Sequence, residues 1–306
     1  MAKTERQAWI EDPDLFMAVE DLELVARGVV EGALHGLHRS PYIGFSSEFD
    51  SHREYQPGDD LRHVNWNLWA RSDRLYVKQY KSDTNLNLYI LLDSSGSMLT
   101  DHGPTEKWKY GARAAAALAF LALSGRDATG AYLLESRVEH FVDPKVRPGQ
   151  LADVLTLLQN ANPSESPDPS ARGDIGQALD EARQLCKRRG IVILISDLFD
   201  KEEAILRGLN NLRYMGHEVI VMQVLDPWEV DLPEEGQYAF RDLETGEEIQ
   251  THPAEVRNSY RRLVEEWRDG FRKHCEDTGI DWVSCTTEEP LRKLLVDYLL
   301  KRSRMY

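Results

Sequence analysis

Residues 86–98 read Leu-Asn-Leu-Tyr-Ile-Leu-Leu-Asp-Ser-Ser-Gly-Ser-Met, and this stretch decides the fold. Apolar side chains fill most of positions 86–92, a run that is typical of a strand buried on both faces of a parallel sheet. Asp93 stands where such a strand leaves the sheet, and the serines and glycine after it predict the turn into a helix. Because ligands of open α/β sheets bind beyond the carboxyl ends of the strands, this position indicates a binding site.

The side chains of Asp93, Ser95 and Ser97 provide oxygen atoms at every second position. In an extended loop this spacing points all three side chains the same way. One carboxylate and two neutral hydroxyls suit a hard divalent cation that keeps several water molecules. Two structural alternatives stay open: Ser97 caps the following helix, or Asp93 is a buried carboxylate satisfied by hydrogen bonds. Enzyme chemistry with Asp93 as an aspartyl-phosphate nucleophile is the third alternative.

A second apolar run, residues 191–195, ends in Ser196 and Asp197 and is followed by a predicted helix over 201–214. Both buried strands therefore deliver an aspartate to the carboxyl edge of the predicted sheet. We expect Asp93 and Asp197 to share one cation there. The alternative for Asp197 is that it only caps the following helix.

Composition restricts the class of protein. A chain of 306 residues with 42% hydrophobic residues and seven tryptophans can build one large α/β domain with an appendage. A net charge of −15 disfavours nucleic acid or an anionic membrane as the main partner. Cys186, Cys275 and Cys285 have no paired spacing and predict reduced thiols. We find no signal peptide and no apolar run that spans a bilayer, and so expect a soluble, cytoplasmic protein.

Strands alternating with helices predict an α/β fold, a Rossmann-like, mostly parallel sheet with helices on both faces. A hairpin of strands 128–135 and 138–142 is expected at one sheet edge, and further strands over 218–225 and 280–285. The helix predicted over 256–278 has Leu263 among the residues expected on its core face. The other predicted helices cover residues 105–123, 148–158, 174–189, with Gly190 closing the last, and 290–301.

The chain is expected to divide into residues 1–82, an N-terminal helix and appendage packed on the main domain, and residues 83–306, the α/β domain. A β-hairpin insertion is expected at about 227–252, and a strand over 75–80 precedes the central one. Within the appendage, arginines alternate with carboxylates. They form either a structural lock against the main sheet or a partner-docking face, whose candidate residues are Arg53, Asp59, Asp60 and Arg62.

Two motifs resemble known families. The Asp93-x-Ser95-x-Ser97 motif with the later Asp197 resembles the metal-ion-dependent adhesion site of von Willebrand factor A domains. A longer motif resembles the bacterial domain-of-unknown-function 58 family, von Willebrand A relatives that are typically encoded beside MoxR-type AAA+ ATPases. That motif is Arg53-x-Tyr55-x-x-Gly58-Asp59-Asp60-x-Arg62, followed by Trp66 and Ala70-Arg71.

The resemblance implies a von Willebrand factor A-like fold with Mg²⁺ or Mn²⁺ at the sheet edge. The implied ligands are Asp93, Ser95 and Ser97, with Asp197 direct or through water. The adhesion-site pattern also expects a threonine two residues before Ile175, where this chain has Gly173. Either Asp174 or Ser170 then takes the place of that threonine, or the site is weak or empty.

A cation with few charged ligands keeps an open position that a partner's carboxylate can fill. No general base or positioned nucleophile accompanies it, so we predict a non-enzymatic, metal-dependent protein-interaction module. The resemblance implies work with a MoxR-type AAA+ ATPase in assembling or activating other proteins. The alternatives are a metal-dependent phosphatase with Asp93 as nucleophile and a structural scaffold with a vestigial metal site.

Overall fold

The computed structural model describes residues 49–54, 76–80, 86–161, 163, 174–241 and 248–303. Outside these residues lie the predicted N-terminal helix, most of the Arg53–Arg71 motif with Asp59, Asp60 and Arg62, and also Ser170 and Gly173. The chain divides into two units, which are described separately. In the smaller unit, β1 (Phe49–Glu54) pairs antiparallel with β2 (Tyr76–Tyr80). The strand expected over 75–80 is therefore confirmed, whereas its partner β1 was not predicted.

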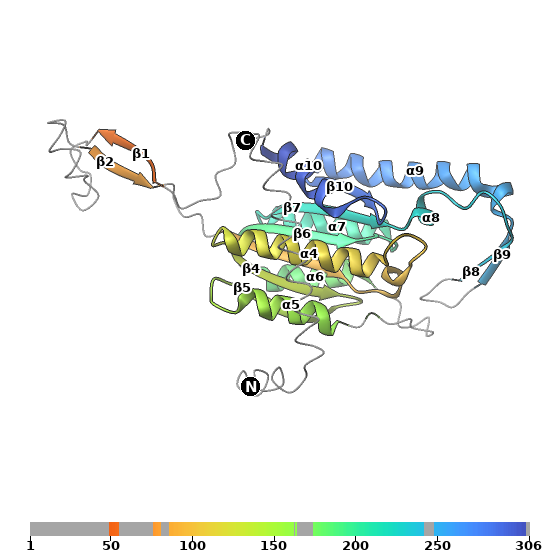
Figure 1. Cartoon of the computed structure of the whole chain (residues 1–306), viewed down its shortest axis with the longest axis horizontal. Coiled ribbons are helices and arrows are strands. Elements are labelled where there is room, and N and C mark those ends of the chain that lie inside the picture. Colours follow the sequence, from red (N-terminus) through yellow and green to blue (C-terminus); the bar gives the residue numbers. More distant parts are fainter. Residues whose placement is uncertain are drawn as a thin grey trace. The chain divides into compact units, whose positions relative to one another are not determined.

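The larger unit contains the central sheet, which has six strands within the described residues (Figure 1). They are β3 (Asn87–Asp93), β4 (Ala128–Leu134), β5 (Val138–Lys145), β6 (Gly190–Ser196), β7 (Glu218–Leu225) and β10 (Asp281–Thr286). Their spatial order is β5-β4-β3-β6-β7-β10, which is the 3-2-1-4-5-6 order of a doubly wound sheet. Only the β4–β5 pair among them is antiparallel, so the predicted fold class and edge hairpin are confirmed.

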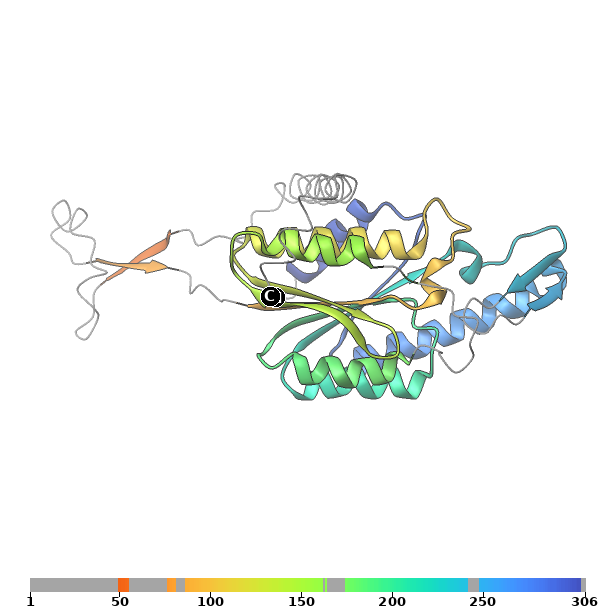
Figure 2. The same ribbon diagram turned by 90° about the horizontal axis from the view of Figure 1, so that it is seen from below.

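Helices cover both faces of this sheet (Figure 2). One face carries α4 (Lys107–Ser124), α5 (Gln150–Asn160) and α10 (Leu291–Ser303); the other carries α6 (Ile175–Leu185), α7 (Glu202–Tyr214) and α9 (Pro253–Thr278). The central strand β3 explains this arrangement, because its side chains alternate between the faces. Leu88, Ile90 and Leu92 belong to the first core, and Tyr89 and Leu91 to the second. A chain with this pattern needs helices on both sides of the sheet to exclude water.

Two details of the predicted helices are wrong. The helix expected over 174–189 ends at Leu185, and Gly190 begins β6 instead of closing the helix. A Cβ atom on Gly190 would lie 2.0 Å from the carbonyl oxygen of Asn87, so the close approach of β6 to β3 explains the glycine. Leu263 of α9 is 60% exposed and lies outside the core. The adjacent Val264 is buried instead, so Leu263 lies beside the buried face of α9 and not on it.

The insertion after β7 is a hairpin, as predicted. It consists of the short helix α8 (Pro227–Val230) and the antiparallel strands β8 (Tyr238–Arg241) and β9 (Glu248–Thr251). The three cysteines are buried and free, in agreement with the predicted reduced thiols. Among the helices of the described residues, none has the length and apolar character that a membrane span requires.

Candidate functional site

The two predicted aspartates emerge side by side from neighbouring strands. β3 and β6 are parallel and paired in register, with Leu92 opposite Ile195. Asp93 is therefore level with Ser196, and Asp197 follows one residue beyond. Both carboxylates are buried, each residue being 1% exposed. The sheet thus brings two acidic groups together at its carboxyl edge, as the sequence predicted.

Asp93 is surrounded by neutral hydrogen-bond donors. Its Oδ1 accepts from the backbone N–H of Ser95 at 2.9 Å, and its Oδ2 accepts from the hydroxyl of Ser196 at 2.5 Å. Burial and, second, the charge of Asp197 raise the pKa of Asp93, these hydrogen bonds lower it, and the net result is a pKa of about 7. Within the described part of the chain, no lysine or arginine forms an ion pair with it. Asp93 is therefore a desolvated acid that would gain from a nearby cation.

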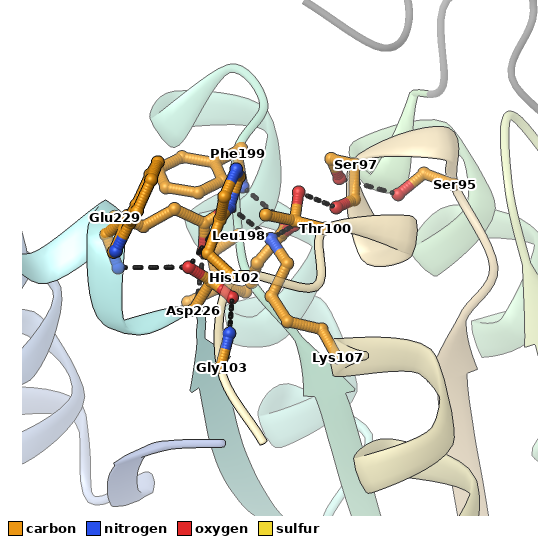
Figure 3. Close-up of polar contacts among 12 residues, drawn as sticks. Ser95, Ser97, Thr100, His102, Gly103, Lys107, Leu198, Phe199, Asp226 and Glu229 are labelled. Carbon is orange, nitrogen blue, oxygen red and sulfur yellow. Dashed lines mark hydrogen bonds and ion pairs between the residues drawn. The ribbon is translucent and has the colours of Figure 1, made fainter. Parts of the chain in front are cut away.

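The serine hydroxyls of the loop after β3 face each other. Ser95 Oγ and Ser97 Oγ are 3.1 Å apart (Figure 3). The loop continues into the short 3-10 helix η2 (Gly96–Leu99), whose N-cap is Ser95 and whose cap makes no side-chain hydrogen bond. The alternative that Ser97 caps the next helix is therefore wrong. Each hydroxyl keeps a lone pair that a cation or a water molecule can use.

Asp197 differs from Asp93 in that a positive charge contacts it. Its Oδ2 accepts from Lys107 Nζ at 2.7 Å, and its Oδ1 accepts from the backbone N–H of Phe199 at 3.0 Å. The N-cap of α7 is Lys201, so the alternative that Asp197 caps this helix is wrong. Between Asp197 and Phe199 the backbone of Leu198 is left-handed, with φ of 65°. Leu198 is non-glycine and fully buried, and this conformation directs Asp197 and Phe199 toward Lys107.

Lys107 is a functional residue that the sequence analysis missed. Its side chain is 0% exposed and bonds both Asp197 and, at 2.5 Å, Glu229 Oε1 of α8 (Figure 3). Its ammonium nitrogen also lies 5.2 Å from the ring centroid of Phe199. Burial lowers the pKa of Lys107, but the two carboxylates raise it more, so the net shift is upward. The buried ammonium of Lys107 therefore links Asp197 at the sheet edge to Glu229 in the insertion.

A second buried acidic group supports this junction from β7. Asp226 is fully buried and accepts from the backbone N–H groups of Gly103 at 3.0 Å and Trp228 at 2.9 Å, and His102 Nδ1 lies 3.4 Å from its Oδ1. The backbone N–H of Asp226 donates in return to Glu229 Oε2 at 2.8 Å. Burial raises the pKa of Glu229 to about 7, against the opposing effect of Lys107. The loop before α4 and the start of α8 are thus held together.

The donor set partly fits a divalent cation. Asp93, Ser95 and Ser97 supply one carboxylate and two hydroxyls that are not paired with a basic group. Both oxygens of Asp197 are already engaged, so its direct coordination would compete with Lys107. No group of three or more His, Cys, Asp or Glu side chains in the described residues could hold a metal. A cation here would depend on serine hydroxyls and water, as Mg²⁺ readily does.

Of the other predicted site residues, the structure describes only Asp174 in full. Asp174 is the N-cap of α6, where its Oδ1 accepts from the backbone N–H of Gln177 at 2.8 Å. It lines the same groove as Ser97. Arg53 belongs to β1, and the remaining docking candidates lie outside the described residues, so the docking face stays a prediction.

The fold and this edge define a doubly wound α/β domain with an acidic site at the carboxyl edge of its sheet. The chain belongs to the family described as "Protein of unknown function DUF58", whose model matches residues 51–270. Uncharacterized proteins of Mycobacterium bovis and of Mycobacterium tuberculosis are each 30% identical to it over 299 residues. The matched residues are 96% of this chain and 92% of each relative.

Solved structures with a similar arrangement have low sequence identity. One is the conserved hypothetical protein BatB from Bacteroides thetaiotaomicron, at 18% identity and a TM-score of 0.47, covering 72% of this chain and 99% of that one. An aerotolerance-related membrane protein from Bacteroides fragilis has 15% identity and a TM-score of 0.47 over 72% and 100%. The SpRpn10 VWA domain has 11% identity and a TM-score of 0.39 over 69% and 93%.

Proposed function

We propose that this protein is a non-enzymatic, metal-dependent protein-interaction module. The observation that supports the proposal is the state of Asp93, a buried carboxylate beside two paired serine hydroxyls and without a basic partner among the described residues. Mg²⁺ or Mn²⁺ bound to Asp93, Ser95 and Ser97 would keep positions open for water. A carboxylate of a partner protein would replace one of these waters.

Binding is favoured over turnover by the surroundings of Asp93. Both of its oxygens accept hydrogen bonds and the residue is 1% exposed, which is a poor arrangement for an attacking nucleophile. Lys107, the buried lysine of this sheet edge, is held by Asp197 and Glu229. These features disfavour the phosphatase alternative with Asp93 as nucleophile.

The partner that we propose is a MoxR-type AAA+ ATPase, with which the module would assemble or activate other proteins in the cytoplasm. Support for this partner is the family membership together with the motif of residues 53–71. The matched relatives are uncharacterized and leave the partner open to experiment.

The test is binding of the purified protein to a purified, nucleotide-free MoxR-type ATPase from the same organism, measured with MgCl₂ and with EDTA. Asp93→Ala and Ser97→Ala are expected to abolish the magnesium-dependent part of the binding. Ser94→Ala is the matched control, because the Ser94 hydroxyl donates to the Leu134 carbonyl and is not free to bind a metal. Magnesium-independent binding that Asp93→Ala leaves unchanged would contradict the proposal.

The scaffold alternative has one specific observation in its favour: Lys107 already supplies a positive charge at Asp197. If the site is vestigial, calorimetric titration with MgCl₂ or MnCl₂ will show no heat of binding. The phosphatase alternative requires that the protein hydrolyse a generic phosphate ester and that Asp93→Ala abolish this hydrolysis. The unmodified protein and Asp93→Ala, compared in the binding, calorimetric and hydrolysis assays, therefore separate all three functions.

A further inference from the structure

A large groove opens between the carboxyl edge of the sheet and the β8–β9 hairpin. Its volume is about 1430 Å³. Small-molecule pockets are usually about 300–1,000 Å³, so the groove is large enough for a segment of polypeptide. Its aromatic lining consists of Phe199, Trp228, Tyr238, Phe240, Tyr260 and Trp267.

The aromatic wall is pre-organised by contacts between the rings. Phe199 stacks on Trp267, with ring centroids 5.1 Å apart and ring planes at 9°. The Lys107 ammonium lies against the Phe199 ring. Trp228 stacks on His102 at 4.2 Å and meets Tyr238 edge-on at 5.2 Å. Rings fixed in this way lose little conformational entropy when a ligand binds.

Apolar side chains of the groove are exposed to solvent. Phe199 is 40% exposed, and Ile249, on the hairpin, is 68% exposed. Both side chains line the groove, and no other segment of the described residues covers them. Exposed apolar groups gathered in a concave, polar-rimmed surface are typical of a protein-interaction site.

Carboxylates determine the charge of the groove. Asp101, Asp174 and Asp200 line it, and no lysine or arginine of the described residues forms an ion pair with them. Among the described residues, the Asp200 oxygens accept from the backbone N–H groups of Ile175 and Lys201, each at 2.7 Å. Glu229 also lines the groove but is paired with Lys107, and the three aspartates alone outnumber the basic lining residues, Lys201 and Arg241. Charge complementarity therefore favours a cationic ligand.

We propose that this groove binds a segment of a partner protein in which large apolar side chains stand beside lysine or arginine. The apolar side chains would contact the aromatic wall, and the basic groups would pair with Asp101, Asp174 and Asp200. This binding needs no metal ion. It therefore goes beyond the proposed function and is independent of it.

The experiment uses three fluorescein-labelled synthetic peptides and the full chain in EDTA, with binding measured by fluorescence anisotropy. In the first peptide phenylalanine and leucine alternate with lysine, in the second glutamate replaces lysine, and in the third serine replaces the apolar residues. We expect the first peptide to bind about tenfold tighter than either of the others. Equal binding of the acidic peptide, binding of the serine peptide as tight as the first, or no binding of any peptide would overturn the proposal.

Two variants locate the binding to the groove without disturbing the core. Ile249→Ala removes an exposed groove residue, and its matched control is Leu263→Ala on α9, which is 60% exposed and outside the groove lining. Asp101→Asn removes an exposed charge, and Asp277→Asn is the control for it. We expect about tenfold weaker binding for Ile249→Ala and about threefold for Asp101→Asn, with no change in either control. If variants and controls behave alike, the peptide does not bind in this groove.

Discussion

Asp93 and Asp197 occupy equivalent places at the ends of neighbouring strands, yet their surroundings differ. Each is 1% exposed. Asp197 is paired with the buried ammonium of Lys107, whereas Asp93 has only hydroxyl and amide donors among the described residues. The pKa of Asp93 is accordingly raised to about 7 by burial and by the charge of Asp197.

This difference divides the sheet edge into two functional halves. The half around Lys107 is internally balanced and ties α4 to α8, so it serves stability. The half around Asp93 carries an acid and two hydroxyls that lack a counter-charge within the described residues, so it is the half where an external cation would lower the free energy. Four predictions test this division.

The largest effect is expected for Lys107→Met. This change leaves Asp197 and Glu229 buried beside each other without a cation, and the free energy of unfolding should fall by about 3–5 kcal/mol. Urea unfolding at pH 8 measures it. The control is Lys109→Met, because the Lys109 side chain is 61% exposed and pairs only with Glu106. A loss no greater than that of the control would mean that Lys107 is not a stabilising centre.

The next effect concerns the half around Asp93 and depends on the proposed metal site. MgCl₂ at about one hundred times its dissociation constant should raise the free energy of unfolding by about 2.7 kcal/mol, because it binds only the folded state. Asp93→Asn should lose this increase, and the remote Asp277→Asn should keep it. Thermal unfolding with MgCl₂ and with EDTA measures both. An increase of the same size in Asp93→Asn would place the cation elsewhere.

A smaller effect is expected in the pH dependence of stability. The pKa of Glu229 is raised by burial from 4.5 to about 7, so the folded state binds more protons than the unfolded state between these values. The contribution of Glu229 is therefore fully present below pH 4.5 and is lost as the pH rises through about 7. Glu229→Gln should make the stability curve shallower in this interval, as measured by urea unfolding from pH 5 to pH 8. Superimposable slopes for the two proteins would contradict the assignment.

The smallest effect is expected for Ser97→Ala in the absence of metal. The Ser97 side chain is half-buried and its hydroxyl contacts only that of Ser95 among the described side chains, so the free energy of unfolding should change by less than about 0.5 kcal/mol. The response to MgCl₂ should nevertheless decrease. A large loss of stability in EDTA would show that Ser97 is structural and would remove it from the proposed ligand set.

Sequence reasoning found both aspartates of this edge and missed the lysine that pairs with one of them. Asp93 follows an apolar run and is spaced two residues from each serine, so local order in the sequence was sufficient to find it. Lys107 looks like an ordinary polar residue at the start of a helix. Its partners, Asp197 and Glu229, are 90 and 122 residues away in the chain, and no periodic pattern links positions so distant. The same limit applies to Leu263, which was expected on the core face, whereas the adjacent Val264 is the buried residue.

The sequence by itself determined most strands and helices of the main domain, the edge hairpin and the arrival of two aspartates at one sheet edge, because hydrophobic periodicity depends on nearby residues. Only the tertiary structure decided which aspartate receives a cation from the protein, and that an aromatic groove forms beside the hairpin. Both outcomes depend on contacts between remote segments, where burial removes water and makes each counter-charge strong.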